Sequence, residues 1–98
     1  MLAQVKITNN SDKWTTALHQ RIDPGATATV ETVKPHETLE GKIQSGAVGT
    51  LAVVITNTGT DPFPVDVIYG GSDFVLAPGA VDSSISGPVV RFKIGVRA

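Results

Sequence analysis

The side chains best suited to catalysis or metal binding are few and far apart in this 98-residue sequence. His19 and His36 are the two histidines, and they stand 17 positions apart on separate expected strands or turns. A catalytic or metal-binding histidine needs convergent partners, and none stands beside either one. Cysteine is absent, which removes thiolate nucleophiles, disulfides and Cys-based zinc sites. We therefore predict no catalytic residue, no metal site and no cofactor, and thus no enzyme.

Two further patterns of acidic residues could indicate a catalytic or metal-binding site. Glu37 and Glu40 are the closest carboxylates that could share an orientation, and a solvated turn accounts for them. The run from Asp82 to Ser86 matches the D-x-S-x-S pattern of metal-ion-dependent adhesion sites. That site requires a strand-to-helix loop in an α/β domain and further ligands downstream, whereas only twelve residues follow Ser86. We interpret this match as chance.

Apolar residues alternate with polar or small residues along most of the chain, which predicts strands rather than helices. Turn-forming residues interrupt this pattern every 8 to 15 positions. We expect a single all-β domain over residues 1–98, either a small β-sandwich (immunoglobulin-like or jelly-roll-like) or a barrel, with roughly seven to eight short antiparallel strands. No internal repeat is evident, and residues 34–40 support one helical turn at most. The clearest strands are predicted around residues 5–7, 26–33, 51–56, 65–69 and 90–96.

Two of these segments carry more detailed predictions. Residues 5–31 are typical of a three-stranded meander, with a polar turn after the first strand and a Pro-Gly turn before the third. The strand at 51–56 is largely apolar on both faces, which indicates a central position in its sheet. Val53 is expected on its buried face.

Composition limits the partners and the location of the protein. Net charge is −1 and charged residues make up 17% of the chain, which gives no electrostatic case for nucleic acid or an acidic membrane as a partner. A near-neutral chain also associates with itself more easily, so we expect a homo-oligomer. Residues 1–10 contain one lysine and no apolar core, so we predict no signal peptide, and no apolar run is long enough to span a membrane.

Two aromatic residues are candidates for contacts with another chain. Trp14 lies in a polar stretch, where a lone tryptophan either folds back over the rim of the core or meets a partner. Phe63 stands between Pro62 and Pro64, which indicates an edge segment with an exposed aromatic side chain.

The last predicted strand offers a third candidate interface. Its side chains Arg91, Lys93 and Arg97 share one face if the strand is regular. This basic face is either a solvated surface or a patch that meets carboxylates of another subunit. Nucleic acid is the weakest interpretation, because no stacking aromatics lie among these cations.

The opening segment also resembles a known family. Residues 5–31 combine a first strand, an Asn-rich turn, a leucine-histidine segment, a Pro-Gly turn and a Thr/Val strand. This order is similar to that of short structural proteins of tailed bacteriophages. The resemblance implies a virion protein, a capsid decoration (cement) or head-associated component, with capsid or other virion proteins as partners, made in the host cytoplasm. The matching residues are Val5, Ile7, Asn9, Leu18, His19, Ile22, Pro24, Gly25 and Val30.

A second resemblance leaves other functions open. Residues 49–67 are similar to immunoglobulin-like domains, although the Cys…Trp…Cys framework is missing. The alternatives are therefore an immunoglobulin-like binding module for carbohydrate or a host surface, and a small inhibitor or accessory subunit that acts through a loop over residues 34–49. Few aromatic residues are available for a sugar platform.

Overall fold

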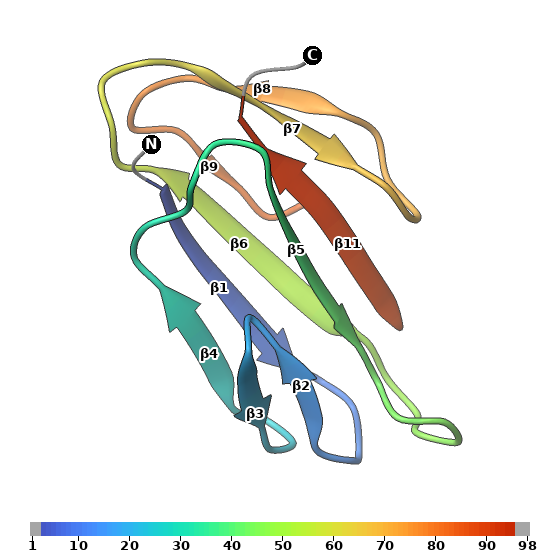
Figure 1. Ribbon diagram of the computed structural model, residues 1–98. Helices are drawn as coiled ribbons and strands as arrows, with labels where there is room; N and C mark the ends of the chain where they lie inside the picture. Colours follow the sequence, from blue (N-terminus) through green and yellow to red (C-terminus); the bar gives the residue numbers. More distant parts are fainter. Residues whose placement is uncertain (1–2, 96–98) are drawn as a thin grey trace.

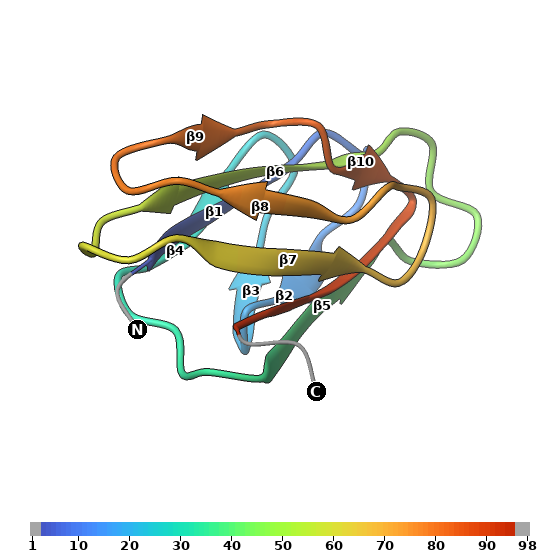
Figure 2. The same cartoon turned by 90° about the horizontal axis from the view of Figure 1, so that it is seen from above.

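Two antiparallel β-sheets pack face to face in the computed structural model, which describes residues 3–95 (Figure 1, Figure 2). Within that range no helix occurs, and the predicted all-β sandwich is confirmed. These residues form eleven strands rather than seven or eight, because several connecting segments contain short strands of two or three residues. Sheet A has the order β10-β6-β1-β4 with β9 also on β6, and sheet B has the order β3-β2-β5-β11-β7-β8. Sheet A contains β1 (Ala3–Asn9), β4 (Thr27–Val30), β6 (Leu51–Asn57), β9 (Val81–Asp82) and β10 (Ser86–Gly87). Sheet B contains β2 (Thr15–Ala17), β3 (Gln20–Ile22), β5 (Glu37–Lys42), β7 (Phe63–Val67), β8 (Phe74–Leu76) and β11 (Val89–Ile94).

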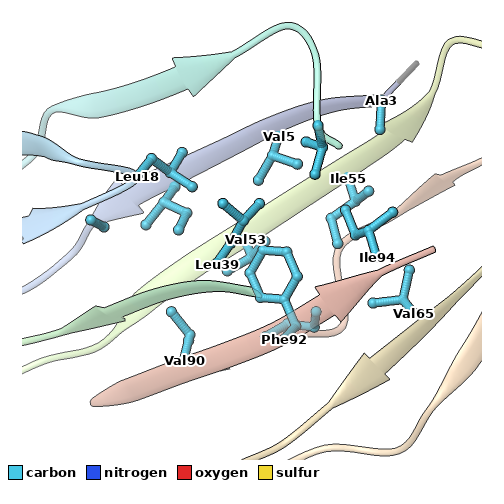
Figure 3. Packing of buried hydrophobic residues seen from close by; sticks show 14 of the residues in the cluster. Ala3, Val5, Leu18, Leu39, Val53, Ile55, Val65, Val90, Phe92 and Ile94 are labelled. Atoms are coloured by element: carbon cyan, nitrogen blue, oxygen red, sulfur yellow. The ribbon is translucent and has the colours of Figure 1, made fainter. Parts of the chain in front are cut away.

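Alternate side chains of both sheets meet in one apolar core (Figure 3). Val5 on β1 lies opposite Ile55 on β6, and Phe92 on β11 projects from the other sheet. Removing such side chains from water contributes about 25 cal/mol per Å² of apolar surface. The prediction for the strand at 51–56 is confirmed, because β6 lies between β1 and the short strands β9 and β10, and Val53 is buried.

Residues 5–31 do not form the expected meander. β1 and β4 pair in sheet A, whereas the segment between them folds as the hairpin β2–β3 in sheet B. The hairpin turns at Leu18 and His19, whose φ angles are +53° and +58°. Two consecutive positive φ angles match the tight turn that best joins twisted strands, although glycine and asparagine usually occupy it. The middle strand of the predicted meander is therefore two strands.

Residues 34–40 contain no helical turn. Glu37 begins β5, and the preceding turn is closed by a hydrogen bond from the Lys34 amide to the Glu37 carboxylate. Because β5 takes up Glu37–Lys42, the long loop expected over residues 34–49 is also absent. Only the segment between β5 and β6 remains as a connection.

The two halves of the chain repeat the same path around an approximate twofold axis. β1 and β6 both end in Ile-Thr-Asn, and each is followed by a hairpin in sheet B and a Pro-Gly-Ala turn back to sheet A. In each turn the asparagine amide donates to the alanine carbonyl, from Asn9 to Ala26 at 2.9 Å and from Asn57 to Ala80 at 3.0 Å. The central strands β5 and β11 then pair with each other. The prediction that the chain has no internal repeat was wrong for the fold. The repeat was not recognised in the sequence because the two halves share only these short motifs.

Candidate interaction site around Trp14

A hollow opens where β2 stops pairing with β5. β2 pairs with β5 only at Thr16 and Ala17 and then turns back at Leu18, whereas β5 extends to Glu37. The difference in strand length leaves an open hollow of about 600 Å³ beside β5, the Trp14 hollow. Its lining residues are Trp14, Thr15, Thr16, Ala17, Leu18, His19, Thr38, Leu39, Glu40, Gly41, Lys42, Gln44 and Val89.

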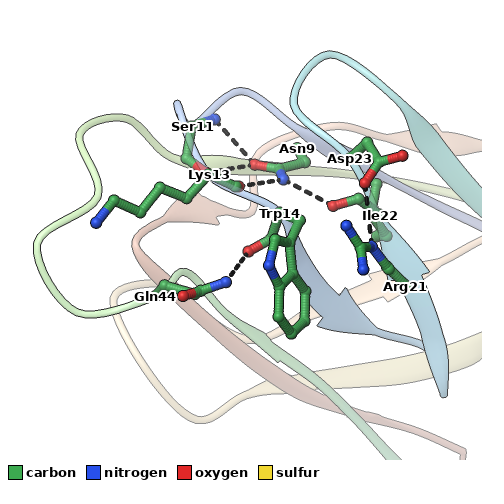
Figure 4. Close-up of polar contacts among 8 residues, drawn as sticks. All are labelled: Asn9, Ser11, Lys13, Trp14, Arg21, Ile22, Asp23 and Gln44. Atoms are coloured by element: carbon green, nitrogen blue, oxygen red, sulfur yellow. Dashed lines mark hydrogen bonds and ion pairs between the residues drawn. The ribbon is translucent and has the colours of Figure 1, made fainter.

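Trp14 stands at the rim of this hollow and is 44% exposed. The guanidinium of Arg21 lies over its ring, 4.6 Å from the centroid, and the Gln44 side chain donates a hydrogen bond to its carbonyl (Figure 4). Arg21 also pairs with Asp23 across 3.2 Å. A cation above an exposed indole contributes about 0.5–1 kcal/mol. The indole is thus held in a defined position while much of its surface remains accessible to a partner.

The turn that leads into Trp14 is fixed by a buried asparagine. Asn9 donates from Nδ2 to the Lys13 carbonyl at 2.9 Å and to the Ile22 carbonyl at 3.0 Å (Figure 4). Its Oδ1 accepts hydrogen bonds from the amide and the hydroxyl of Ser11. These contacts connect β1, the turn and β3, so the position of Trp14 follows from the core of the sandwich.

Carboxylates stand beside the two described cations on the outer face of β11. Arg91 Nε lies 3.3 Å from Glu40 Oε2 on β5, an ion pair whose geometry does not include a hydrogen bond from that nitrogen. Lys93 stands opposite Asp66 in the register between β11 and β7. Each of these two cations therefore has a carboxylate on a neighbouring strand. Arg97, the third predicted member of this face, lies outside the described residues.

Phe63 was predicted to be exposed, and the structure contradicts this. It is the first residue of β7 and is 1% exposed, opposite Leu76 of β8. Alternation along β7 turns Phe63 inward together with Val65, and Pro64 outward. Nor is β7 an edge strand, because β8 lies beyond it. The Pro64 carbonyl accepts a hydrogen bond from the Gly95 amide just past the end of β11. Pro64 lacks an amide donor, but this interrupts no position in the register between β7 and β11.

The carboxylates singled out in the sequence do not converge. Glu37 and Glu40 point to opposite faces of β5, because they are three positions apart and successive side chains of a strand alternate between its faces. The carboxylate of Asp82 accepts hydrogen bonds from the amide and hydroxyl of Ser84, which forms a local turn. Among residues 3–95, no three metal-binding side chains lie close enough together to hold an ion. In the same range, no helix has the length and apolarity needed to cross a membrane.

The fold defines the class of the protein as a two-sheet antiparallel β-sandwich. Comparison of the chain with protein-family models, curated proteins and solved structures found no match. Sequence reasoning identified Trp14 but missed Arg21 and Gln44, which contact it, and Lys42, which lines the same hollow. Arg21 comes from β3, whereas Lys42 and Gln44 come from the end of β5 and the residues after it, and no spacing in the sequence signals that these two segments meet Trp14.

Proposed function

We propose that the protein is a structural protein of a tailed-bacteriophage virion, of the capsid decoration (cement) kind, that binds the shell through protein–protein contacts. The resemblance of residues 5–31 to such proteins motivates the proposal. The structural observation that supports the proposal most directly is the composition of the outer face of sheet A.

This face presents mostly uncharged side chains over three adjacent strands. The register of β1 with β4 and β6 puts eight outward-facing residues side by side, of which one, a lysine, is charged. The hydroxyls of Thr8 and Thr27 are hydrogen-bonded to each other at 2.8 Å. Depletion of charge is typical of the centre of a protein–protein interface. The eight residues are Gln4, Lys6, Thr8, Thr27, Thr29, Ala52, Val54 and Thr56.

The size of the face also suits a protein partner. The sandwich measures 39 × 22 × 18 Å along its principal axes. A partner that covers one broad face would bury on the order of 800 Å² of this chain, the area per partner in a standard interface. The outer face of sheet B differs, since Glu40, Arg91 and Lys93 place alternating charges across its centre.

Co-sedimentation with purified virions tests the proposal. The substitution Val54→Glu introduces a charge at the centre of the outer face of sheet A, where the side chain is half-buried. Val75→Glu is the control on the outer face of sheet B, at an exposed position on β8 opposite Pro64 and outside the Trp14 hollow. We expect the wild type and the control to sediment with virions of the phage that encodes the protein, and V54E to remain in the supernatant.

Two results would contradict the proposal. The first is a wild-type protein that stays free of virions, and the second is V54E binding that equals wild-type binding. Gene order provides an independent test: a major capsid or portal gene next to this one supports a virion role, and a glycoside-processing cluster opposes it.

A further inference from the structure

The Trp14 hollow lies on the outer face of sheet B. The outward side chains of β5, which are Thr38, Glu40 and Lys42, line it on one side, and Thr16 of β2 stands opposite Lys42. All four are half-buried or exposed, and Trp14 stands at the rim. The hollow therefore combines a row of hydrogen-bonding side chains with a single exposed aromatic ring.

The second half of the internal repeat has the corresponding strands without this lining. Strand register aligns residues 14–17 with residues 62–65, and residues 38–42 with residues 91–95. None of the three residues that replace Trp14, Thr16 and Lys42 has a side chain that forms hydrogen bonds. Because equivalent strands pair in both halves, the sandwich does not require the tryptophan or its polar neighbours. The replacing residues are Pro62, Pro64 and Gly95.

The indole of Trp14 is held in position by its neighbours. The Arg21 guanidinium lies 4.6 Å from the ring centroid and is itself paired with Asp23 at 3.2 Å (Figure 4). The Gln44 side chain donates a hydrogen bond to the Trp14 carbonyl at 2.8 Å. Trp14 lines the hollow and Arg21 does not, so the guanidinium supports the ring from outside the hollow. A side chain that is ordered in advance loses less conformational entropy when a ligand binds.

The charges of the lining do not select a charged ligand. Glu40 and Lys42 have opposite charges on the outer face of β5, and Glu40 Oε2 lies 3.3 Å from Arg91 Nε. Together with the hydroxyls of Thr16 and Thr38, these two side chains provide both donors and acceptors of hydrogen bonds. A neutral ligand with several hydroxyl groups matches this set, because each hydroxyl both donates and accepts.

Trp14 is the most exposed apolar residue of the lining. Its exposed fraction is 44%, whereas the core-facing residues Ala17, Leu18 and Leu39 are at most 4% exposed. A ligand that is apolar on several sides would therefore find few contacts here. A sugar ring instead has C–H groups on one face, which pack against an indole, and hydroxyls around its edge.

We infer that the Trp14 hollow binds a neutral oligosaccharide, with one sugar ring against the indole of Trp14 and its hydroxyls hydrogen-bonded to Thr16, Glu40 and Lys42. The volume of about 600 Å³ lies within the range of roughly 300–1,000 Å³ that is typical of small-molecule sites. Since the hollow has one aromatic ring, it holds one stacked sugar, and the rest of the oligosaccharide extends through the open side. The inference goes beyond the proposed function and does not depend on it, because the proposed virion contacts lie on sheet A.

Titration of the purified chain tests the inference. The probes are neutral hexasaccharides of glucose, galactose, mannose or N-acetylglucosamine, with a hyaluronan hexasaccharide as the anionic comparison and a proline-rich decapeptide as the peptide comparison. We expect at least one neutral hexasaccharide to bind with a dissociation constant of about 1 mM or tighter in calorimetry. The same probe should shift the emission of Trp14, which is the single tryptophan. Raising the salt from 0.1 M to 1 M should change the affinity by less than about twofold, because salt screens interactions between charges.

Variants on the outer face of sheet B show whether binding occurs in the hollow. Trp14→Ala removes the ring, and Thr16→Arg fills the hollow from an exposed position on β2. Each should weaken binding about tenfold or more, as truncation of a central contact residue does. Trp14→Phe keeps a smaller ring and should retain part of the affinity, and it replaces W14A if that variant melts early. Val75→Arg is the matched control for T16R, because Val75 is exposed on the same face outside the hollow and its variant should bind like the wild type.

The inference is overturned if no neutral hexasaccharide binds at about 10 mM, since the dissociation constant would then exceed that value. It is also overturned if W14A and T16R bind as tightly as the wild type, or if the hyaluronan hexasaccharide or the decapeptide binds in preference to every neutral probe. Virion binding without saccharide binding would overturn this inference alone. Saccharide binding by a chain that stays free of virions would instead overturn the proposed function.

Discussion

Asn9 and Asn57 make the same side-chain contacts at opposite ends of the central strand pair of sheet A. Asn57 donates from Nδ2 to the Asp61 carbonyl at 2.8 Å and to the Leu76 carbonyl at 3.0 Å, as Asn9 does to its two carbonyls. Each Oδ1 accepts from the amide two residues later, that of Ser11 or Gly59. Both residues are almost completely buried. One side chain in each half thus joins a strand of sheet A to a hairpin of sheet B.

Replacing either asparagine with aspartate should destabilise the fold severely. Asn9→Asp keeps the shape of the side chain but removes both donors, and it faces a carboxylate towards two carbonyl oxygens. We expect the free energy of unfolding to fall by about 3 kcal/mol or more, measured by urea denaturation. The neighbouring control Asn10→Asp is exposed and should change it by about 0.5 kcal/mol or less. Equal effects of the two substitutions would show that the Asn9 contacts contribute nothing.

Two glycines with positive φ should respond differently to alanine. At Gly49, where φ is +125°, an added Cβ would lie 2.2 Å from the Asn10 carbonyl oxygen, whereas at Gly25, where φ is +81°, it would meet nothing within 4 Å. We expect Gly25→Ala to cost about 1–2 kcal/mol from backbone strain alone. Gly49→Ala should cost about 2 kcal/mol more, because the backbone must also move. Thermal melts compare the stabilities of the two variants. If G49A is as stable as G25A, the connection over residues 43–50 moves to accommodate the Cβ at no energetic cost.

Substitutions at two adjacent valines of β6 should distinguish the buried face of sheet A from its outer face. Val53→Asp puts a carboxylate into the core opposite Ile7, and we expect the domain to unfold. Val54→Asp places the same charge on the outer face opposite Lys6, where the cross-strand pair is favourable and the domain should stay folded. Circular dichroism during heating distinguishes the outcomes. If V53D melts cooperatively near the wild-type temperature, Val53 does not face the core and the register given for β6 is wrong.

Reversing the charge of Arg91 should leave the domain folded. Arg91→Glu creates two like charges at the pair with Glu40, whose side chains are 40% and 68% exposed. Solvent screens such a pair, so the expected cost is at most about 1 kcal/mol. The double variant Glu40→Arg/Arg91→Glu restores opposite charges and should recover most of that loss in a double-mutant cycle. A loss that the double variant does not recover would mean that Arg91 stabilises the sheet through other contacts.

The strands that alternate over many residues were the most predictable part of the fold. β1, β6 and β11 each carry an apolar residue at every second position for six or seven residues, and this period identifies a strand without reference to its neighbours. The connection at Leu18 and His19 was not predictable, because the positive φ angles of a tight turn fall there on residues that rarely adopt them. The predicted meander was wrong for that reason.

The candidate site was predictable only in part. Trp14 was recognised as a lone aromatic residue in a polar stretch, but Phe63, chosen for its flanking prolines, lies in the core. Local composition describes how polar a segment is, whereas the direction of each side chain depends on the phase of its strand relative to the sheet. The same limit applies to Arg91, which shares a face with other cations in its own strand and meets Glu40 only through pairing with β5.

The sequence by itself determined that this chain is all-β, with the core residues of its longest strands, because period-two alternation and turn residues act over a few neighbouring positions. Tertiary structure decided which strands share a sheet and which carboxylate meets each cation. It also decided that a short hairpin on one side of β11 leaves the Trp14 hollow, while a hairpin with a longer connection on the other side exposes Ile68 and Tyr69. Those outcomes depend on register between segments as far apart as Thr16 and Lys42, and no local pattern specifies a pairing across that separation.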